Sequence, residues 1–256
     1  MKQIKGGVTA AKGYEAASTA AGIKYQGRTD MALIYSQVPC VSAGTFTTNV
    51  VKAAPVKWDR QIVDSGAGVQ AVVVNSGIAN ACTGEEGMGY CKETAEAAAK
   101  ALNIDAAGVL VGSTGVIGMQ LPMQKLVDGI QVLAGKKAEG LQSGHDAALA
   151  IMTTDTVEKE MAVEIEIGGK TVTIGGMAKG SGMIHPNMGT MLCFITTDCA
   201  VSSEMIRKAL LFNVKRTFNR VTVDGDTSTN DTLLVLANGM AENPEITEEN
   251  EDYKVF

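Results

Sequence analysis

The sequence of 256 residues has few aromatic side chains, which make up 4% of it, and it contains two histidines. Its Lys and Arg residues are scattered along the chain, and the formal net charge is −6 at neutral pH. Domains that bind nucleic acids usually gather basic residues into a patch that neutralises phosphates. We therefore expect no nucleic-acid partner.

Cysteine pairing and long hydrophobic runs are also missing. The five cysteines are odd in number and include no Cys-x-x-Cys pair, which favours reduced thiols over a disulfide framework. No hydrophobic run reaches membrane-spanning length, and the first residues lack the apolar segment of a signal peptide. The sequence therefore predicts a soluble, cytoplasmic protein with no membrane partner.

Several familiar catalytic and ligand-binding motifs are absent. Nucleotide binding has little support, because there is no Walker motif and no Gly-x-Gly-x-x-Gly. His145 and His185 are not accompanied by the Gly-x-Ser-x-Gly elbow of α/β hydrolases. The acidic segment 224–231 has Thr229 where a calcium-binding loop of the EF-hand type needs glycine. We therefore expect no metal site there.

What is abundant is glycine, with 29 residues, together with alanine and valine. The valine-rich runs 69–74 and 109–111 have the continuous apolar pattern of strands buried on both faces. Residues 88–102 and 120–138 have apolar side chains at helical spacing. Residues 163–174 alternate around a Gly-Gly turn and predict a β-hairpin. This order of elements indicates an α/β protein.

Other segments give weaker predictions. Residues 31–35, 191–195 and 233–236 are expected to form strands, and a helix is expected between Ser202, as its cap, and Phe218. Residues 41–49 are small and polar. They are expected either to line a site or to form a loop at the edge of a sheet.

Polar residues follow two of the buried strands. The first strand continues as Asn75-Ser76-Gly77, and the second as Gly112-Ser113-Thr114-Gly115. In α/β proteins such strand ends often contact ligands, and backbone N–H groups beside a hydroxyl can form an oxyanion hole. Both segments are also typical of tight turns. The residue types alone leave the two interpretations open.

Residues 177–192 combine turn-forming glycines and a proline with the reactive side chains of Lys179 and Thr190. A threonine hydroxyl becomes a nucleophile when a base removes its proton, and its own α-amine can be that base once the chain is cut before it. Gly189 would permit the backbone distortion that such a cut requires. Lys179 could then stabilise an oxyanion or a carboxylate. The alternative is an ordinary Gly-Thr turn before a buried strand, with Lys179 on the surface.

The segment Lys-Gly-Ser-Gly-Met-Ile-x-Pro-Asn-Met-x-Thr-Met-Leu at 179–192 resembles the self-cleavage and nucleophile motif of the ornithine acetyltransferases, the glutamate N-acetyltransferases of arginine biosynthesis. The resemblance extends over the chain and includes Asp-Gly-Asp-Thr-Ser-Thr-Asn-Asp at 224–231. It implies an α/β (α+β) protein with an αββα-type layered fold, and self-cleavage between Gly189 and Thr190. Residues 1–189 would form an α-chain and residues 190–256 the first part of a β-chain.

The resemblance also implies a reaction. Thr190 would take the acetyl group of N2-acetyl-L-ornithine as an ester and pass it to L-glutamate by a ping-pong mechanism. Thr114 and Gly115 would stabilise the oxyanion, and Thr153 and Lys179 would hold the substrate together with Thr190. No cofactor or metal is implied. Whether acetyl-CoA serves as a second acetyl donor stays open.

The chain departs from the resembled family at two places. Gly189 stands where the family usually has alanine, and family members continue beyond the position of Phe256, so the C-terminal part of the fold is expected to be missing. The alternatives are therefore a related Thr-nucleophile amidase or peptidase and an inactive, truncated remnant. We expect an oligomer of the cleaved chains, and apolar surface that the missing part would have covered. Asp226, Thr227 and Asn230 are expected to help shape the pocket.

Overall fold

The structure is a computed structural model that describes residues 1–182 and 191–256. Nine strands and six α-helices occur in this described part, and two of the helices, α4 and α6, are short. The strands are β1 (Lys2–Ile4), β2 (Tyr14–Thr19), β3 (Met31–Phe46), β4 (Val69–Ile78), β5 (Val109–Val116), β6 (Lys159–Ile167), β7 (Lys170–Lys179), β8 (Leu192–Thr197) and β9 (Thr232–Ala237). The helices are α1 (Ala54–Ser65), α2 (Glu86–Leu102), α3 (Met123–Lys136), α4 (Leu141–Ala150), α5 (Ser203–Val214) and α6 (Glu251–Val255).

Strand β3 belongs to two sheets. Its first half pairs antiparallel with β2 and β4, and its second half pairs antiparallel with β9 after an irregularity between Tyr35 and Cys40. We call the sheet of β2, the first half of β3, β4 and β5 sheet B. Sheet A has the order β1-β6-β7-β8-β9 followed by the second half of β3. The irregularity lets one strand pass from one layer to the next.

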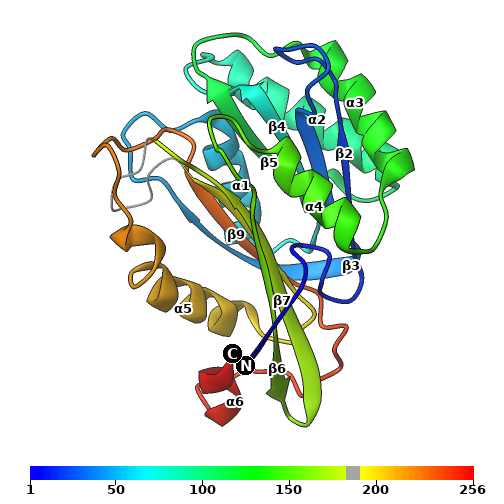
Figure 1. The fold of residues 1–256 in the computed structure, drawn as a ribbon, viewed down its shortest axis with the longest axis vertical. Coiled ribbons are helices and arrows are strands. Elements are labelled where there is room, and N and C mark those ends of the chain that lie inside the picture. The colour runs from blue at the N-terminus through cyan, green and yellow to red at the C-terminus, as the bar shows by residue number, and fades with distance from the viewer. Residues whose placement is uncertain (183–190) are drawn as a thin grey trace.

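Three apolar cores fill the spaces between four layers. One core joins helices α2 and α3 to the outer face of sheet B, and a second lies between the two sheets. The third joins helix α5 to the outer face of sheet A. Helices α2 and α3 therefore lie on the opposite side of the molecule from α5 (Figure 1). This order of layers confirms the predicted αββα fold.

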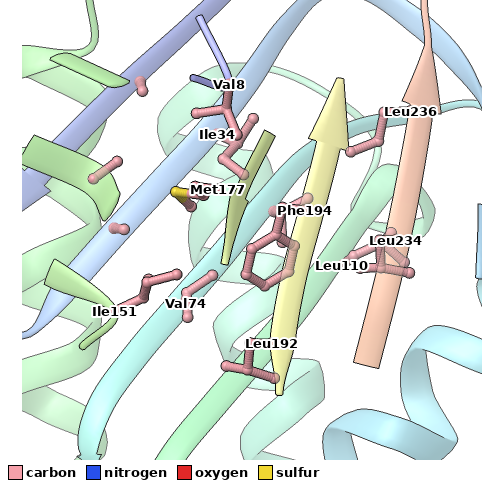
Figure 2. Close-up of a cluster of buried hydrophobic side chains, with 14 of the residues drawn as sticks. Val8, Ile34, Val74, Leu110, Ile151, Met177, Leu192, Phe194, Leu234 and Leu236 are labelled. Atoms are coloured by element: carbon pink, nitrogen blue, oxygen red, sulfur yellow. The ribbon is translucent and has the colours of Figure 1, made fainter. Parts of the chain in front are cut away.

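Phe194 lies at the centre of the core between the sheets, among side chains from both of them (Figure 2). Its ring comes from β8 in sheet A and is fully buried. The ring faces Gly112 on β5 in sheet B, where an added Cβ would lie 3.1 Å from Phe194 Cζ. Gly112 therefore leaves the space that the ring fills.

Residues on both sides of the predicted cleavage position belong to sheet A. Strand β8 pairs antiparallel with β7 and parallel with β9, and β9 pairs with β3. Residues 191–256 thus supply two inner strands of the sheet, as well as helix α5. The boundary at Gly189 and Thr190 divides the sequence within one sheet, although these two residues lie outside the described part.

At three segments where the sequence left two interpretations open, the turn or loop alternative is wrong. Residues 75–77 and 112–115 are not turns, because β4 and β5 continue through them as a parallel pair that runs to Ile78 and Val116. Residues 41–46 are not a loop but the second half of β3. In each case hydrogen bonding to a neighbouring strand, which the local sequence does not reveal, outweighs the turn propensity of Ser, Gly and Asn.

Helix α5 leaves part of its sheet uncovered. A groove of about 380 Å³ lies over β6, β7 and β8 and is lined mainly by apolar side chains, among them Ile174, Ile195 and Phe218. This agrees with the expected apolar surface. Among the described helices, none is both long and apolar enough to cross a membrane.

Candidate functional site

A cavity of about 530 Å³ contains four of the predicted site residues. Thr114 and Gly115 come from the end of β5, Thr153 from the segment after α4, and Lys179 from the end of β7. The fold thus brings together residues that are up to 65 positions apart in the sequence. The remaining lining residues are Lys24, Tyr25, Arg28, Asp30, Ser76, Gly77, Val116, Thr154, Ser181, Gly182 and Asp224.

Lys179 and Thr114 are in direct contact across the cavity. The Nζ atom of Lys179 donates a hydrogen bond of 3.1 Å to the Oγ1 atom of Thr114. Both residues are buried, with 3% and 4% of their surface exposed, so the alternative of a surface lysine is wrong. Since Oγ1 accepts this bond, the Thr114 hydroxyl proton can be directed to a different acceptor. A bound oxyanion would be such an acceptor.

Burial lowers the pKa of Lys179, and the nearby carboxylates of Asp155 and Asp231 oppose this effect. The pKa of Asp231 is shifted in the opposite direction. Burial raises the pKa of its carboxyl group to about 8, against the lowering effects of the Met191 amide and of Lys179. An amine and a carboxyl group with pKa values displaced toward neutrality therefore lie near each other, an arrangement that is common in active sites.

The backbone at position 115 strongly favours glycine. Its φ of +132° is strained for other residues, and an added Cβ would lie 2.3 Å from the carbonyl oxygen of Gly77. Gly77, its partner on β4, has a φ of +101°. The two strand ends therefore approach one another closely at the cavity, with no side chain at either position.

The described chain resumes at Met191, directly after the predicted nucleophile. The Met191 N–H donates a hydrogen bond of 2.7 Å to Asp231 Oδ1, and its carbonyl accepts one of 3.0 Å from the Thr232 amide. The other oxygen of Asp231 is buried and has no hydrogen-bond partner within the described residues. Thr190 and Gly189, like His185, lie outside the described part of the chain.

The segment after α4 is fixed from two directions. The guanidinium group of Arg28 donates hydrogen bonds of 2.7 and 3.1 Å to the carbonyl groups of Met152 and Thr153. On the other side, the hydroxyl groups of Thr154 and Ser181 lie 2.7 Å apart. These contacts place Thr153 at the wall of the cavity.

Other sequence-based candidates have mixed outcomes. Ser76 and Gly77 line the cavity, which agrees with the ligand-contact interpretation of that strand end. Asp226, Thr227 and Asn230 do not line it; from the same acidic segment, Asp224 does. Within residues 1–182 and 191–256 there is no group of three or more His, Cys, Asp or Glu side chains that could hold a metal ion.

Sequence reasoning missed the two buried carboxylates near Lys179. Asp155 follows two threonines in what reads as a polar turn, and Asp231 ends an acidic segment directly before β9. For Asp231, its position next to the buried apolar strand could have indicated burial. For Asp155, no local pattern indicates the long-range contacts that it makes.

Comparison with known proteins identifies similar chains. The ArgJ family profile matches residues 15–256. The arginine biosynthesis bifunctional protein ArgJ of Symbiobacterium thermophilum is 55% identical over 258 aligned positions, which cover 100% of this chain and 63% of that protein. The chain therefore spans less than two thirds of the length of this curated relative.

Two crystal structures of similar proteins are 42% identical to this chain. One is the arginine biosynthesis bifunctional protein argJ from Bacillus halodurans, with a TM-score of 0.69, 74% of this chain covered and 97% of that chain. The other is ornithine acetyltransferase from Mycobacterium tuberculosis in complex with ornithine, with a TM-score of 0.65 and coverages of 73% and 96%.

Proposed function

Because the chain belongs to the ArgJ family, we propose that it carries the acetyl-transfer site of an arginine-biosynthesis acyltransferase. The proposed reaction moves the acetyl group of N2-acetyl-L-ornithine to L-glutamate. The observation that carries the proposal is that Thr114, Gly115, Thr153 and Lys179, which come from three separate segments, line one cavity. Met191, which follows the proposed nucleophile, is bonded to Asp231 close to Lys179.

In the first half-reaction, the Thr190 hydroxyl attacks the acetyl carbonyl carbon of N2-acetylornithine. The α-amine of Thr190, freed by cleavage after Gly189, accepts the hydroxyl proton. The oxyanion that forms accepts hydrogen bonds from the hydroxyl group of Thr114 and from a backbone N–H at Gly115. The C–N bond then breaks, and ornithine leaves with the proton on its amine.

In the second half-reaction, the amine of L-glutamate attacks the acetyl-Thr190 ester, and the Thr190 oxygen leaves and regains its proton. Thr153 and Lys179 hold the substrates in both halves. The burial of Lys179 supports this role, since a buried ammonium group interacts more strongly with a carboxylate or an oxyanion than an exposed one does.

Cleavage between Gly189 and Thr190 is tested by the intact mass of the purified chain under denaturing conditions. We expect two pieces, residues 1–189 and 190–256, for the wild type and one piece for Thr190→Ala. Thr190→Ser is the matched control, because it keeps a hydroxyl and should still be cut. An uncut wild-type chain would contradict self-cleavage and favour an inactive remnant.

Acetyl transfer is tested by incubating the chain with N2-acetylornithine, with and without L-glutamate. N-acetylglutamate formed together with ornithine supports the transferase. Acetate released equally in both mixtures would instead favour an amidase. Replacing N2-acetylornithine by acetyl-CoA shows whether this second donor is used. Size-exclusion chromatography of the same sample tests the expected oligomer.

A further inference from the structure

The carboxylate of Asp155 is buried and joins separate segments of the chain. A carboxylate can accept about four hydrogen bonds, and this one accepts three. Its side chain has no exposed surface. Oδ1 accepts hydrogen bonds of 2.7 Å from the Gly180 amide and from Lys159 Nζ. Oδ2 accepts one of 3.3 Å from the Thr153 amide. One carboxylate therefore contacts the backbones of two segments that line the cavity.

Both backbone contacts lie at residues assigned above to substrate binding. Thr153 is held through its own amide, and Lys179 is held through the amide of the next residue, Gly180. The Thr154–Ser181 hydroxyl contact joins the same two segments and should keep them aligned.

The charge of Asp155 is consistent with this role. Burial would raise the pKa of its carboxyl group, but the hydrogen bonds from Lys159, Gly180 and Thr153 and the nearby Lys179 outweigh that effect and lower it. The group is therefore ionised at neutral pH. A charged acceptor binds backbone N–H groups more strongly than a neutral acceptor does.

We propose that Asp155 is a positioning residue, whose carboxylate holds the Thr153 and Gly180 backbones and so sets where Thr153 and Lys179 lie relative to each other in the lining of the cavity. The part of this proposal that concerns the position of the two backbones depends only on the hydrogen bonds of Asp155. Its effect on turnover rests on the proposed function. A misplacement of about 1 Å can lower the rate of an enzyme by about 10²-fold.

The first test is amide hydrogen exchange in Asp155→Asn, measured by NMR. The asparagine amide keeps one acceptor oxygen and loses the other, so exchange at Thr153, Gly180 or both should accelerate about 3- to 10-fold. The matched control is Asp198→Asn. Asp198 is also buried and accepts hydrogen bonds from the Thr173 and Lys12 amides, but it does not line the cavity.

In the control, exchange should change at Thr173 and Lys12 and stay unchanged at Thr153 and Gly180. Unchanged exchange at both Thr153 and Gly180 in a folded Asp155→Asn protein would overturn the proposal. This readout needs no turnover. It therefore decides the placement even if the wild-type chain proves inactive and the proposed function fails.

The second test is the kinetics of acetyl transfer. Because Thr153 and Lys179 hold substrate, Asp155→Asn should raise KM for N2-acetylornithine more than it lowers kcat, with a loss of about 10- to 100-fold in kcat/KM. Asp198→Asn should keep the wild-type KM. Equal kinetic effects of the two variants would overturn the positioning role and leave only a structural one.

Discussion

The hydrogen bond from Lys179 Nζ to Thr114 Oγ1 joins sheet A to sheet B at the cavity. Lys179 is the last residue of β7, and Thr114 lies near the end of β5. The relative position of the two sheets therefore decides whether the proposed substrate-binding lysine reaches the proposed oxyanion donor. Changes that loosen the core between the sheets should affect the site as well as stability.

Replacing the Thr114 hydroxyl tests the oxyanion role. Thr114→Val keeps the size and shape of the side chain, but it removes the hydroxyl, so kcat for acetyl transfer should fall about 10²–10³-fold. Thr114→Ser retains the hydroxyl and should keep most of the activity. Wild-type turnover in a folded Thr114→Val protein would contradict the assignment.

Gly115→Ala should destabilise the protein. The positive φ costs about 1–3 kcal/mol for a residue with a side chain, and the contact with Gly77 adds to this cost. Gly89→Ala is the control, because Gly89 lies within α2 and an added Cβ would meet nothing within 4 Å. This control should raise the free energy of unfolding, measured in urea, by about 0.5–1 kcal/mol. Equal effects would argue against strain at Gly115.

Asp231 should make stability depend on pH. Its pKa is about 8 in the folded protein, against an ordinary value of 3.8, so the folded state binds the proton more tightly than the unfolded state does. The contribution of this group to stability is therefore lost as the pH rises from about 4 to about 8, by at most about 1.4 kcal/mol per pH unit.

Asp231→Asn keeps an acceptor for the Met191 amide and cannot ionise. Urea unfolding over this pH range should show a smaller loss of stability in the variant than in the wild type. Parallel curves for the two proteins would show that the Asp231 pKa is not displaced.

Phe194→Ala should remove the central ring of the core between the sheets. The expected loss in the free energy of unfolding is about 3–5 kcal/mol, since neighbouring side chains can fill only part of the space. Phe212→Ala provides a control, because Phe212 lies on the outside of α5 and is 55% exposed. That substitution should change stability by less than about 0.5 kcal/mol.

The sequence predicted those elements that have a regular pattern of apolar residues within their own segment. The hairpin of β6 and β7, helices α2 and α3 and the buried core of β4 follow from such patterns, and Ser202 caps α5 as expected. The lengths of β3, β4 and β5 could not be predicted in the same way. Their polar ends are held as strands by pairing with distant segments.

The candidate site shows the same division. Thr114, Gly115, Thr153 and Lys179 could be selected through the family resemblance, and the fold places them around one cavity. The residues that hold them in place escaped prediction. Arg28 and Asp155 both form hydrogen bonds with the backbone of Thr153. Because every residue has a backbone carbonyl and almost every residue an N–H group, the sequence does not indicate which backbone a side chain will bind.

The inner position of β8 and β9 in sheet A has a thermodynamic consequence. If the chain is cut before β8, its two pieces remain joined only by non-covalent contacts, including the ladders of β8 with β7 and of β9 with β3. The folded unit then consists of two separate chains, so unfolding also separates the piece 1–189 from the piece 190–256. Its melting temperature should rise more steeply with protein concentration than that of the uncut Thr190→Ala chain.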